Sequence, residues 1–536
     1  MQADFVLSSN AVFTGMRNEP ESLSIAVAGQ TIIGIGSSED VEPCIGPVTR
    51  QFKFENQLIL PGFHDFHVHL MMGSLFLDSV CLSTMRSERE AAMRVKEFAD
   101  AHPNDSWIIG WGWYKDNWEH KQLPSRHSLD EVVRDRPAFL FNAELHGAWL
   151  NTRALAELGI SRTTPDPPFG RVERDNTGDP TGFLYETAMG LWQNACILPW
   201  GKRQNLLDNF LRQARQLGVT AVHDMFPLPG LDFGDLSLYE WFEQNERLTL
   251  RLHFLSALNG NLEQARNQRA QYRSKTLQFS GLKQFLDGVP SAYTAFTVDP
   301  YSDRRDTCGD TLIPPDVIQT WVADADREKF RIRLHACGDA AVRLGLDLYE
   351  HARNLNGQRD SRHAIEHIEV IHPDDIRRLS DLGVIASMQP EHVAATQCFT
   401  DNPYRYRFAG ERLRYLWPMR TLQSHGTSMA FGTDFPVVGL NPFVSVYRAV
   451  TRVHDDGEPS GGWNPEERIA LADALRAYTM GSAYGAFRES ELGTLEVGKL
   501  ADLVVLDRNL FQISPDDIKS ARAVLTMMGG RVVHQA

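Results

Sequence analysis

From residue 204 onward, short apolar segments alternate with amphipathic segments, and this alternation constrains the fold more than any other feature of the chain. Segments such as V-T-A-V-H-D-M, I-R-L-H-A-C-G and M-A-F-G-T-D-F-P have the pattern of strands. Residues 315–327, 341–354 and 373–382 have the pattern of helices between several of them. Strands separated by helices indicate βαβ units and a parallel sheet. With one more strand near residue 65 the count reaches eight, which favours a (β/α)₈ TIM barrel.

That additional strand lies within residues 58–70, L-I-L-P-G-F-H-D-F-H-V-H-L. Side chains alternate between the two faces of a strand, so Asp65, His67 and His69 point the same way. Two imidazoles this close on one rigid strand can hold one metal ion without rearrangement. The alternative for an isolated H-x-H is a half-buried strand whose histidines only form hydrogen bonds, and the rest of the chain has to decide between the two.

Short alternating runs with glycine turns occur at both ends of the chain, so we expect the termini to meet in one small β domain. A region rich in Trp, Pro and Gly follows the first barrel strand and reads as an insertion, with a helix expected over 86–101. The predicted parts are a β-sandwich from 1–57 and 486–536, barrel strand 1 in 58–74, an insertion domain in 75–203, and the TIM barrel in 204–485.

The formal net charge of −15 disfavours nucleic acid and anionic membrane surfaces as partners. The first ten residues have neither a basic segment nor a long apolar core, so we expect no signal peptide. No apolar run approaches the roughly 20 residues that a membrane span needs. The six scattered cysteines suggest reduced, buried thiols and a cytoplasmic protein; they are Cys44, Cys81, Cys196, Cys308, Cys337 and Cys398.

Polar residues of metal-ligand type recur at or near the ends of the predicted barrel strands. These residues are Lys283 in L-K-Q-F-L-D-G, His335 in I-R-L-H-A-C-G-D, His367 in R-H-A-I-E-H and Asp434 in M-A-F-G-T-D. A single such histidine is more often a core residue than a ligand. Several at the strand ends of one barrel, where TIM-barrel chemistry is gathered, indicate a catalytic site for Zn²⁺ or a similar divalent ion.

These segments together resemble the amidohydrolase superfamily. The matching motifs are P-G-F-H-D-F-H-V-H, the lysine strand followed by D-G, L-H-A-C-G-D-A-A-V, R-H-A-I-E-H, F-G-T-D-F-P and G-T-L-E-V-G-K-L-A-D-L-V-V-L-D. Together with L-H-G-A-W-L-N-T-R-A-L they resemble most closely its YtcJ-like branch, which includes N-substituted formamide deformylases. The resemblance covers nearly the whole chain. It implies a metal-bearing TIM barrel, a β-sandwich made from both termini and an inserted domain after the first barrel strand.

The resemblance also implies the role of each residue. His67 and His69 bind the more buried metal, Lys283 is carboxylated and bridges two ions, His335 and His367 hold the second ion, and Asp434 contacts metal and transfers protons. Carboxylation turns an ammonium into an anionic ligand with two oxygens, which a divalent cluster favours. If Lys283 is instead a buried ammonium paired with Asp287 or Asp434, a site with one metal is expected.

Other polar residues near these positions have less certain roles. His64 lies on the opposite strand face from the H-x-H and is expected to be structural. His363 and His367 would face the same side of their strand, and the choice of His367 as the ligand rests on the E-H pattern of the family. His223 and Asp224 also end a strand, where they either line the pocket or support a ligand from behind.

The mechanism expected from this resemblance is hydrolysis. The metal lowers the pKa of a bound water from about 15.7 toward about 7 and polarises the substrate carbonyl. Asp434 accepts the water proton and delivers it to the leaving nitrogen. The scissile bond is expected to be an amide or other C–N bond, not a protein peptide bond, in a small and partly apolar molecule.

The insertion is expected to supply specificity, with Trp111, His146 and Glu186 as substrate-binding residues. Trp107, Trp113 and Trp118 are further candidates for a pocket wall, and the alternative is that tryptophans form the core of the insertion. Rival functions are ester, lactone or phosphoester hydrolysis, ring deamination, or a catalytically silent binding protein. The expected partner is a small-molecule substrate, and the expected cofactor is one or two Zn²⁺ ions per chain. Whether the chain forms a homodimer stays open.

Overall fold

The computed structural model describes residues 1–536 except 169, 193–197, 226–235 and 395. Contacts within the chain divide it into two compact units. The first contains Met1–Val68, Leu211–Met225 and Tyr239–Ala536, and the second contains His69–Phe210 and Phe226–Leu238, less the undescribed residues. Each unit has its own sheet and core and is described by itself.

The first unit is built on eight strands that all pair in parallel. In spatial order they are β6 (Phe63–Val68), β13 (Val219–Asp224), β14 (Arg251–Ala257), β15 (Leu277–Phe285), β16 (Ile332–Ala336), β17 (Ala364–His367), β18 (Ile385–Met388) and β19 (Met429–Phe431). Beyond β19, Phe435 forms a parallel bridge to Val68 of β6, which closes the barrel. The predicted TIM barrel is therefore confirmed.

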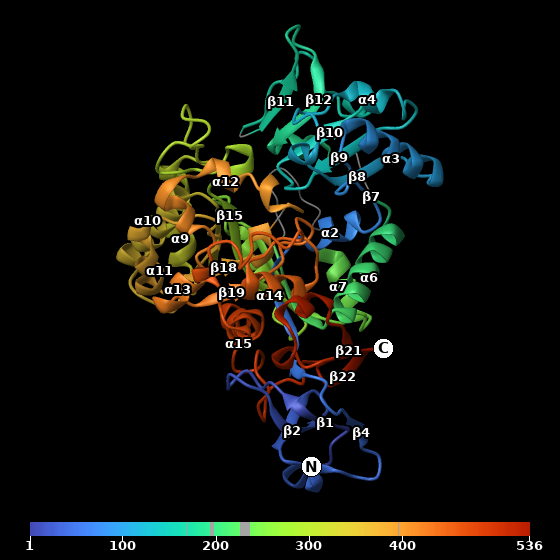
Figure 1. Cartoon of the computed structure of the whole chain (residues 1–536), viewed down its shortest axis with the longest axis vertical. Helices are drawn as coiled ribbons and strands as arrows, with labels where there is room; N and C mark the ends of the chain where they lie inside the picture. The colour runs from blue at the N-terminus through green and yellow to red at the C-terminus, as the bar shows by residue number, and fades with distance from the viewer. Residues whose placement is uncertain (169, 193–197, 226–235, 395) are drawn as a thin grey trace. The chain divides into compact units, whose positions relative to one another are not determined.

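Helices between these strands cover the barrel, and Figure 1 shows α9, α10 and α11 beside one another. The predicted helix 315–327 matches α9 (Pro315–Arg327), and the helices predicted at 341–354 and 373–382 correspond to α10 (Asp339–Asn356) and α11 (Ile376–Leu382). The last is shorter than predicted because Pro373–Asp375 forms a 3₁₀ turn. It ends at Gly383, whose left-handed conformation (φ +67°) is the usual glycine C-cap.

The other helices of the first unit are four to ten residues long. They are α1 (Ser38–Val41), α8 (Glu263–Gln271), α12 (Tyr404–Arg407), α13 (Met419–Ser424), α14 (Pro442–Thr451), α15 (Leu471–Arg476) and α16 (Ser482–Gly485). Two helices, α6 (Trp200–Gln216) and α7 (Leu236–Gln244), contain residues of both units.

Both ends of the chain contribute strands to a second sheet in the first unit. Its strands are β1 (Phe5–Val12), β2 (Glu21–Ala28), β3 (Thr31–Gly36), β4 (Arg50–Lys53), β5 (Ile59–Pro61), β20 (Leu503–Leu506), β21 (Ala523–Met528) and β22 (Arg531–Gln535). β5 joins the two ends, because it pairs in parallel with β1 and antiparallel with β20. Asp502, next to β20, forms a buried bidentate ion pair with Arg251 of the barrel at 2.7 and 2.8 Å.

The second unit contains a six-stranded sheet. Its strands are β7 (Val80–Cys81), β8 (Ile108–Trp113), β9 (Ala138–Asn142), β10 (Gly147–Leu150), β11 (Gly170–Arg174) and β12 (Pro180–Glu186), and its other helices are α2 (Leu70–Phe76), α3 (Glu88–Ala101), α4 (Arg126–Asp130) and α5 (Thr152–Glu157). α3 corresponds to the helix expected over 86–101 and starts later because Ser87 caps its N-terminus. Trp113, Trp118 and Trp149 pack together in the core of this unit, which agrees with the alternative that tryptophans form the core of the insertion.

Among the described residues, no helix combines the length and the apolar character that crossing a membrane requires. The cysteines in the described part of the chain are free thiols, but only Cys337 is buried as expected. Cys81 is exposed, and the others are partly exposed because they lie in short turns or loops near the surface. Cys196 lies outside the described residues.

Candidate metal centre

The carboxyl ends of the barrel strands bring together residues that are far apart in sequence. His67 lies near the end of β6, Lys283 near the end of β15, His335 near the end of β16 and His367 at the end of β17. Asp434 follows β19 by three residues. All five side chains are buried. This end of a TIM barrel is where active sites form.

One group at this end is His67, His367 and Asp434, whose potential ligand atoms lie within 4.8 Å of one another. His67 Nε2 is 3.3 Å from Asp434 Oδ1, and His367 Nδ1 is 3.9 Å from Asp434 Oδ2. The two imidazole rings are 4.9 Å apart between centroids. Two nitrogens and a carboxylate oxygen in this arrangement form a donor set suited to Zn²⁺ and similar ions.

The backbone at this group is held in an uncommon conformation. His367, Ile368 and Asp434 have φ values of 75°, 47° and 62°, in the left-handed region that residues other than glycine rarely adopt. A hydrogen bond of 2.7 Å from the Asp434 amide to the His67 carbonyl fixes one of these turns. Gly432 permits the close approach, since a Cβ there would lie 2.4 Å from the His67 nitrogen. Strained backbone of this kind clusters at functional sites.

His335 and Lys283 lie beside this group. The His335 ring is 4.4 Å from that of His367 between centroids, and its Nε2 is 3.1 Å from the Gly288 carbonyl oxygen. Lys283 Nζ lies 4.7 Å from the centre of the Phe285 ring, which in turn packs against His335 at 4.8 Å.

Lys283 Nζ forms no hydrogen bond and no ion pair within 4 Å with any residue that the structure describes. Asp287, one of its two suggested partners, instead accepts backbone hydrogen bonds from Cys337, Gly338 and Phe296 at 2.9 to 3.0 Å. Burial lowers the pKa of Lys283 to about 8. The lysine is therefore a buried amine with a reduced preference for its charged form.

Glu366 contacts His67 at Nδ1, the ring nitrogen that does not face Asp434. Its Oε2 is 2.7 Å from His67 Nδ1, and both of its oxygens accept hydrogen bonds from Arg333 at 2.6 and 2.8 Å. Burial opposes ionisation of Glu366, but the charge of Arg333 and the hydrogen bond from His67 outweigh it and hold its pKa well below the usual range. Sequence reasoning used Glu366 only to choose His367, although its position in E-H could have identified this role.

His392, which follows β18, was missed by the sequence analysis. Its Nε2 is 3.7 Å from Asp434 Oδ2 and its Nδ1 is 3.2 Å from Glu369 Oε1, while the hydroxyl of Tyr404 donates a short hydrogen bond to the other Glu369 oxygen. The signal that could have found it is its place just after a barrel strand, in M-Q-P-E-H. Through these contacts Glu369 orients a second imidazole toward Asp434.

The protonation of the histidines agrees with a metal-binding role. Burial lowers the pKa of His67 to about 4 and lowers that of His367 well below the usual value, so both imidazoles are neutral at pH 7. His367 Nδ1 is buried without a hydrogen-bond partner among the described residues. Neutral imidazole nitrogens with an unmet bond are the chemical form that a metal ion requires. The residues present therefore fit a divalent ion.

The remaining predicted site residues belong to the second unit. His69 directly precedes α2, His146 Nδ1 is 2.8 Å from Glu186 Oε2, and Trp111 donates a hydrogen bond of 3.0 Å from Nε1 to the Phe76 carbonyl. The Trp111 ring also stacks on Phe76 at 5.2 Å. Metal binding by His69 and substrate binding by the other predicted residues of this unit remain predictions.

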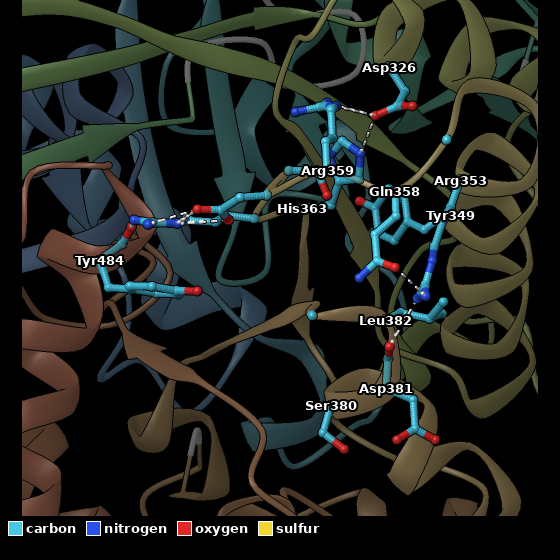
Figure 2. Close-up of a pocket in the computed structure, with 15 residues that line it drawn as sticks. Asp326, Tyr349, Arg353, Gln358, Arg359, His363, Ser380, Asp381, Leu382 and Tyr484 are labelled. Atoms are coloured by element: carbon cyan, nitrogen blue, oxygen red, sulfur yellow. Dashed lines mark hydrogen bonds and ion pairs between the residues drawn. The ribbon is translucent and has the colours of Figure 1, made fainter.

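His363 lies at the opposite end of its strand from His367. Figure 2 shows it among the residues that line a pocket. This pocket has a volume of about 460 Å³ and is lined by the segments just before β17 and β18 together with residues of neighbouring helices. His363 Nε2 is 3.1 Å from Asp326 Oδ1, Nδ1 accepts a hydrogen bond of 3.1 Å from the Ile332 amide, and the ring stacks on Tyr349. These contacts give His363 a structural role.

His64 and His223 stack on each other at 5.0 Å between ring centroids and are both buried. The Arg333 Nη1 atom is 3.3 Å from His223 Nδ1, and Asp224 accepts a hydrogen bond of 2.7 Å from the Tyr239 hydroxyl. Arg333 therefore connects His223 to the Glu366 carboxylate that holds His67.

A family model described as "Amidohydrolase family" matches residues 55–534. Protein LONG AFTER FAR-RED 3 of Arabidopsis thaliana is 31% identical over 99% of this chain and 92% of its own length. Amidohydrolase YtcJ of Bacillus subtilis is 27% identical over 98% of both chains. The N-substituted formamide deformylase of Arthrobacter pascens is 26% identical over 98% of this chain and 97% of its own.

Among solved structures, an uncharacterized metal-dependent hydrolase from Pyrococcus furiosus superimposes with a TM-score of 0.73 at 25% identity, covering 95% of this chain and 99% of that one. A second, from Pyrococcus horikoshii, gives a TM-score of 0.76 at 23% identity over 96% of this chain and 99% of its own. The match therefore extends over nearly the whole chain in both sequence and fold.

Proposed function

The chain belongs to the amidohydrolase family and is a metal-dependent hydrolase, and from this we propose that it cleaves an amide or other non-peptide C–N bond in a small, partly apolar molecule. The observation that carries the proposal is the convergence of His67, His367 and Asp434 at the carboxyl end of the barrel. The relative named N-substituted formamide deformylase, which matches over nearly its whole length, supports a C–N bond as the target.

We propose zinc as the metal, because the donors are imidazole and carboxylate groups. His67, His367 and Asp434 would hold it, and His69, His335 and a carboxylated Lys283 would complete the ligand set of a site with two ions. A bound ion of this kind supplies an activated water at neutral pH and polarises the carbonyl under attack.

Asp434 is proposed to move the proton. Its carboxylate is buried, lies between His67 and His367, and has His392 on another side at 3.7 Å. A carboxylate so placed takes a proton from the attacking water and returns it to the nitrogen that leaves. His392, held by Glu369, limits the positions that the Asp434 carboxylate can adopt.

The proposal is tested with metal-stripped protein to which Zn²⁺ is returned. The panel contains N-substituted formamides, N-acyl amino acids, a ring amine, lactones and phosphotriesters. Zinc-dependent release of amine from the first two groups, lost in Asp434→Asn, is the expected result. Turnover of only lactones or phosphotriesters, or amine release that a chelator does not affect, would contradict the C–N assignment or the metal dependence respectively.

A further inference from the structure

Three histidines stack inside the barrel, outside the proposed metal centre. His64 of β6, His223 of β13 and His253 of β14 lie on three neighbouring strands, and His223 pairs in register with His253. The ring centroids are 4.8 to 5.3 Å apart and the ring planes differ by only 12° to 27°. All three side chains are at most 3% exposed.

The stack contains polar atoms whose hydrogen bonds are unmet. His64 Nε2, His223 Nε2 and both ring nitrogens of His253 are buried and form no hydrogen bond with any residue of the described chain. A neutral imidazole has one N–H donor and one acceptor, and burying either without a partner destabilises the folded state. Native structures usually satisfy such groups, so a bound species not belonging to the protein is expected here.

Arg331 adds an uncompensated charge to the same part of the barrel. It is 6% exposed, its Nη2 donates to Ser280, and its Nε and Nη1 have no hydrogen-bond partner among the described residues. No carboxylate of the described chain lies within 4 Å of it, whereas each nearby buried arginine has one. Those pairs are Arg251 with Asp502, Arg333 with Glu366, and Arg488 with Glu491.

Arg331 lies near the histidine stack, with the Phe66 ring as a shared neighbour. Its guanidinium carbon is 6.0 Å from the centre of the Phe66 ring, which contacts the His223 ring at 4.4 Å between centroids. Burial lowers the pKa of all three histidines and the positive charge of Arg331 lowers them further, so the imidazoles are neutral. A guanidinium remains charged in proteins, and a buried charge without a partner is costly.

The charge and ring geometry favour an anion over a metal ion. The potential ligand atoms of the three histidines lie within 4.8 Å of one another, which by distance alone would also permit a metal. A divalent cation would, however, add positive charge beside an unpaired arginine. Nearly parallel rings also place their nitrogens side by side, whereas tetrahedral coordination needs them directed at one centre. An anion accepts N–H bonds from imidazole and guanidinium groups and neutralises Arg331.

We propose that a small monovalent inorganic anion of halide size binds inside the barrel between Arg331 and the stacked residues His64, His223 and His253. The site is separate from the metal centre, and the inference does not depend on the proposed reaction. Its role is structural: it completes the charge balance and hydrogen bonding of the barrel interior beneath the strand ends that hold His67 and His367.

The first test measures thermal unfolding in gluconate buffer at constant ionic strength, after refolding without halide so that no trapped ion remains. Added chloride is expected to raise the Tm of the wild-type protein. At a chloride concentration 100 times Kd, the ratio of folded to unfolded protein should rise about 100-fold. Arg331→Met should lose this response, while Arg359→Met, which removes an arginine paired with Asp326, should keep it.

The second test does not depend on a variant that folds. Crystals of the wild-type protein grown in bromide should give an anomalous peak among Arg331 and the three histidines, at a place distinct from the metal centre. Equal chloride responses in the wild-type and Arg331→Met proteins would overturn the proposal. So would bromide data with only water density at this place, or a transition metal bound by the three histidines.

Discussion

Glu366 Oε2 lies 2.7 Å from His67 Nδ1 and fixes which nitrogen of that imidazole faces Asp434. Glu366 is ionised, since its pKa lies well below the usual range, and an ionised carboxylate can only accept hydrogen bonds. His67 must therefore carry its proton on Nδ1. This leaves the lone pair on Nε2, 3.3 Å from Asp434, for a metal ion.

Glu366→Gln should weaken metal binding. A glutamine replaces one of the two acceptor oxygens by an NH₂ donor, which must face an N–H group of either His67 or Arg333, and it also removes the negative charge that both residues contact. Loss of a partner that orients a metal-binding histidine typically lowers metal affinity about 10- to 100-fold. Competition with a zinc chelator measures this affinity.

Ser387→Ala is the matched control, because it removes one hydrogen bond to Glu366 and leaves the bond to His67 in place. It should retain most of the zinc affinity. Equal affinities for the Glu366→Gln and wild-type proteins would show that Glu366 does not orient His67.

Asp434→Asn should remove most of the turnover. The substitution keeps the size of the side chain but removes its ability to take a proton from water, an effect typically of about 10²- to 10⁴-fold on kcat. Since Asp434 is also a proposed ligand, kcat is calculated per bound zinc ion. A variant with full metal content and near-normal kcat would exclude proton transfer by Asp434.

The barrel could be predicted from the sequence because its signals are local. Strand segments alternate with helices such as 315–327, and the order along the chain determines which strands are neighbours in a parallel barrel. The strand ends then indicated Lys283, His335, His367 and Asp434 as neighbours. Each of these inferences needs only the position of a residue within its own strand.

The contacts behind the ligands could not be predicted in the same way. Glu366 and His67 are 299 residues apart in the sequence. The position of His392 depends on how the segment after β18 turns back toward Asp434. Pairing of this kind depends on side-chain rotamers and loop paths in three dimensions. Alternation of side chains along a strand also could not separate His363 from His367, because residues four positions apart face the same side, although His363 precedes β17 and His367 ends it.

Loading of zinc into protein stripped of metal should accelerate with bicarbonate and with rising pH if Lys283 becomes carboxylated. Only the neutral amine reacts with carbon dioxide, and burial lowers the lysine pKa to about 8. The neutral fraction therefore rises from about a tenth at pH 7 to about nine tenths at pH 9. Lys283→Ala should lose the bicarbonate effect, and added acetate should restore part of its activity. Lys96→Ala, at an exposed position, serves as control.

The folded protein should lose stability below about pH 6.5, the usual histidine pKa. The pKa of His64 falls to about 3 on burial and those of His223 and His253 are also well below normal, so the unfolded chain binds more protons in this range. Each histidine can then contribute up to about 1.4 kcal/mol per pH unit to the loss. Urea unfolding at several pH values measures the slope. His253→Phe should reduce it, while a substitution at exposed His120 should not.

His363→Ala and His367→Ala should have opposite consequences, although both histidines lie in or beside β17. Removing His363 leaves the buried Ile332 amide without its acceptor and frees Asp326 from one partner, at a cost to folding of about 1–3 kcal/mol, with zinc content retained. Removing His367 takes away a buried imidazole whose Nδ1 lacks a hydrogen-bond partner in the described chain, so zinc content and turnover should fall while the folding cost stays smaller. Urea unfolding of the metal-free proteins together with elemental analysis separates the two effects. A His363→Ala protein that folds normally but contains no zinc would reverse the assignment, and His363 would then have to be counted among the metal ligands.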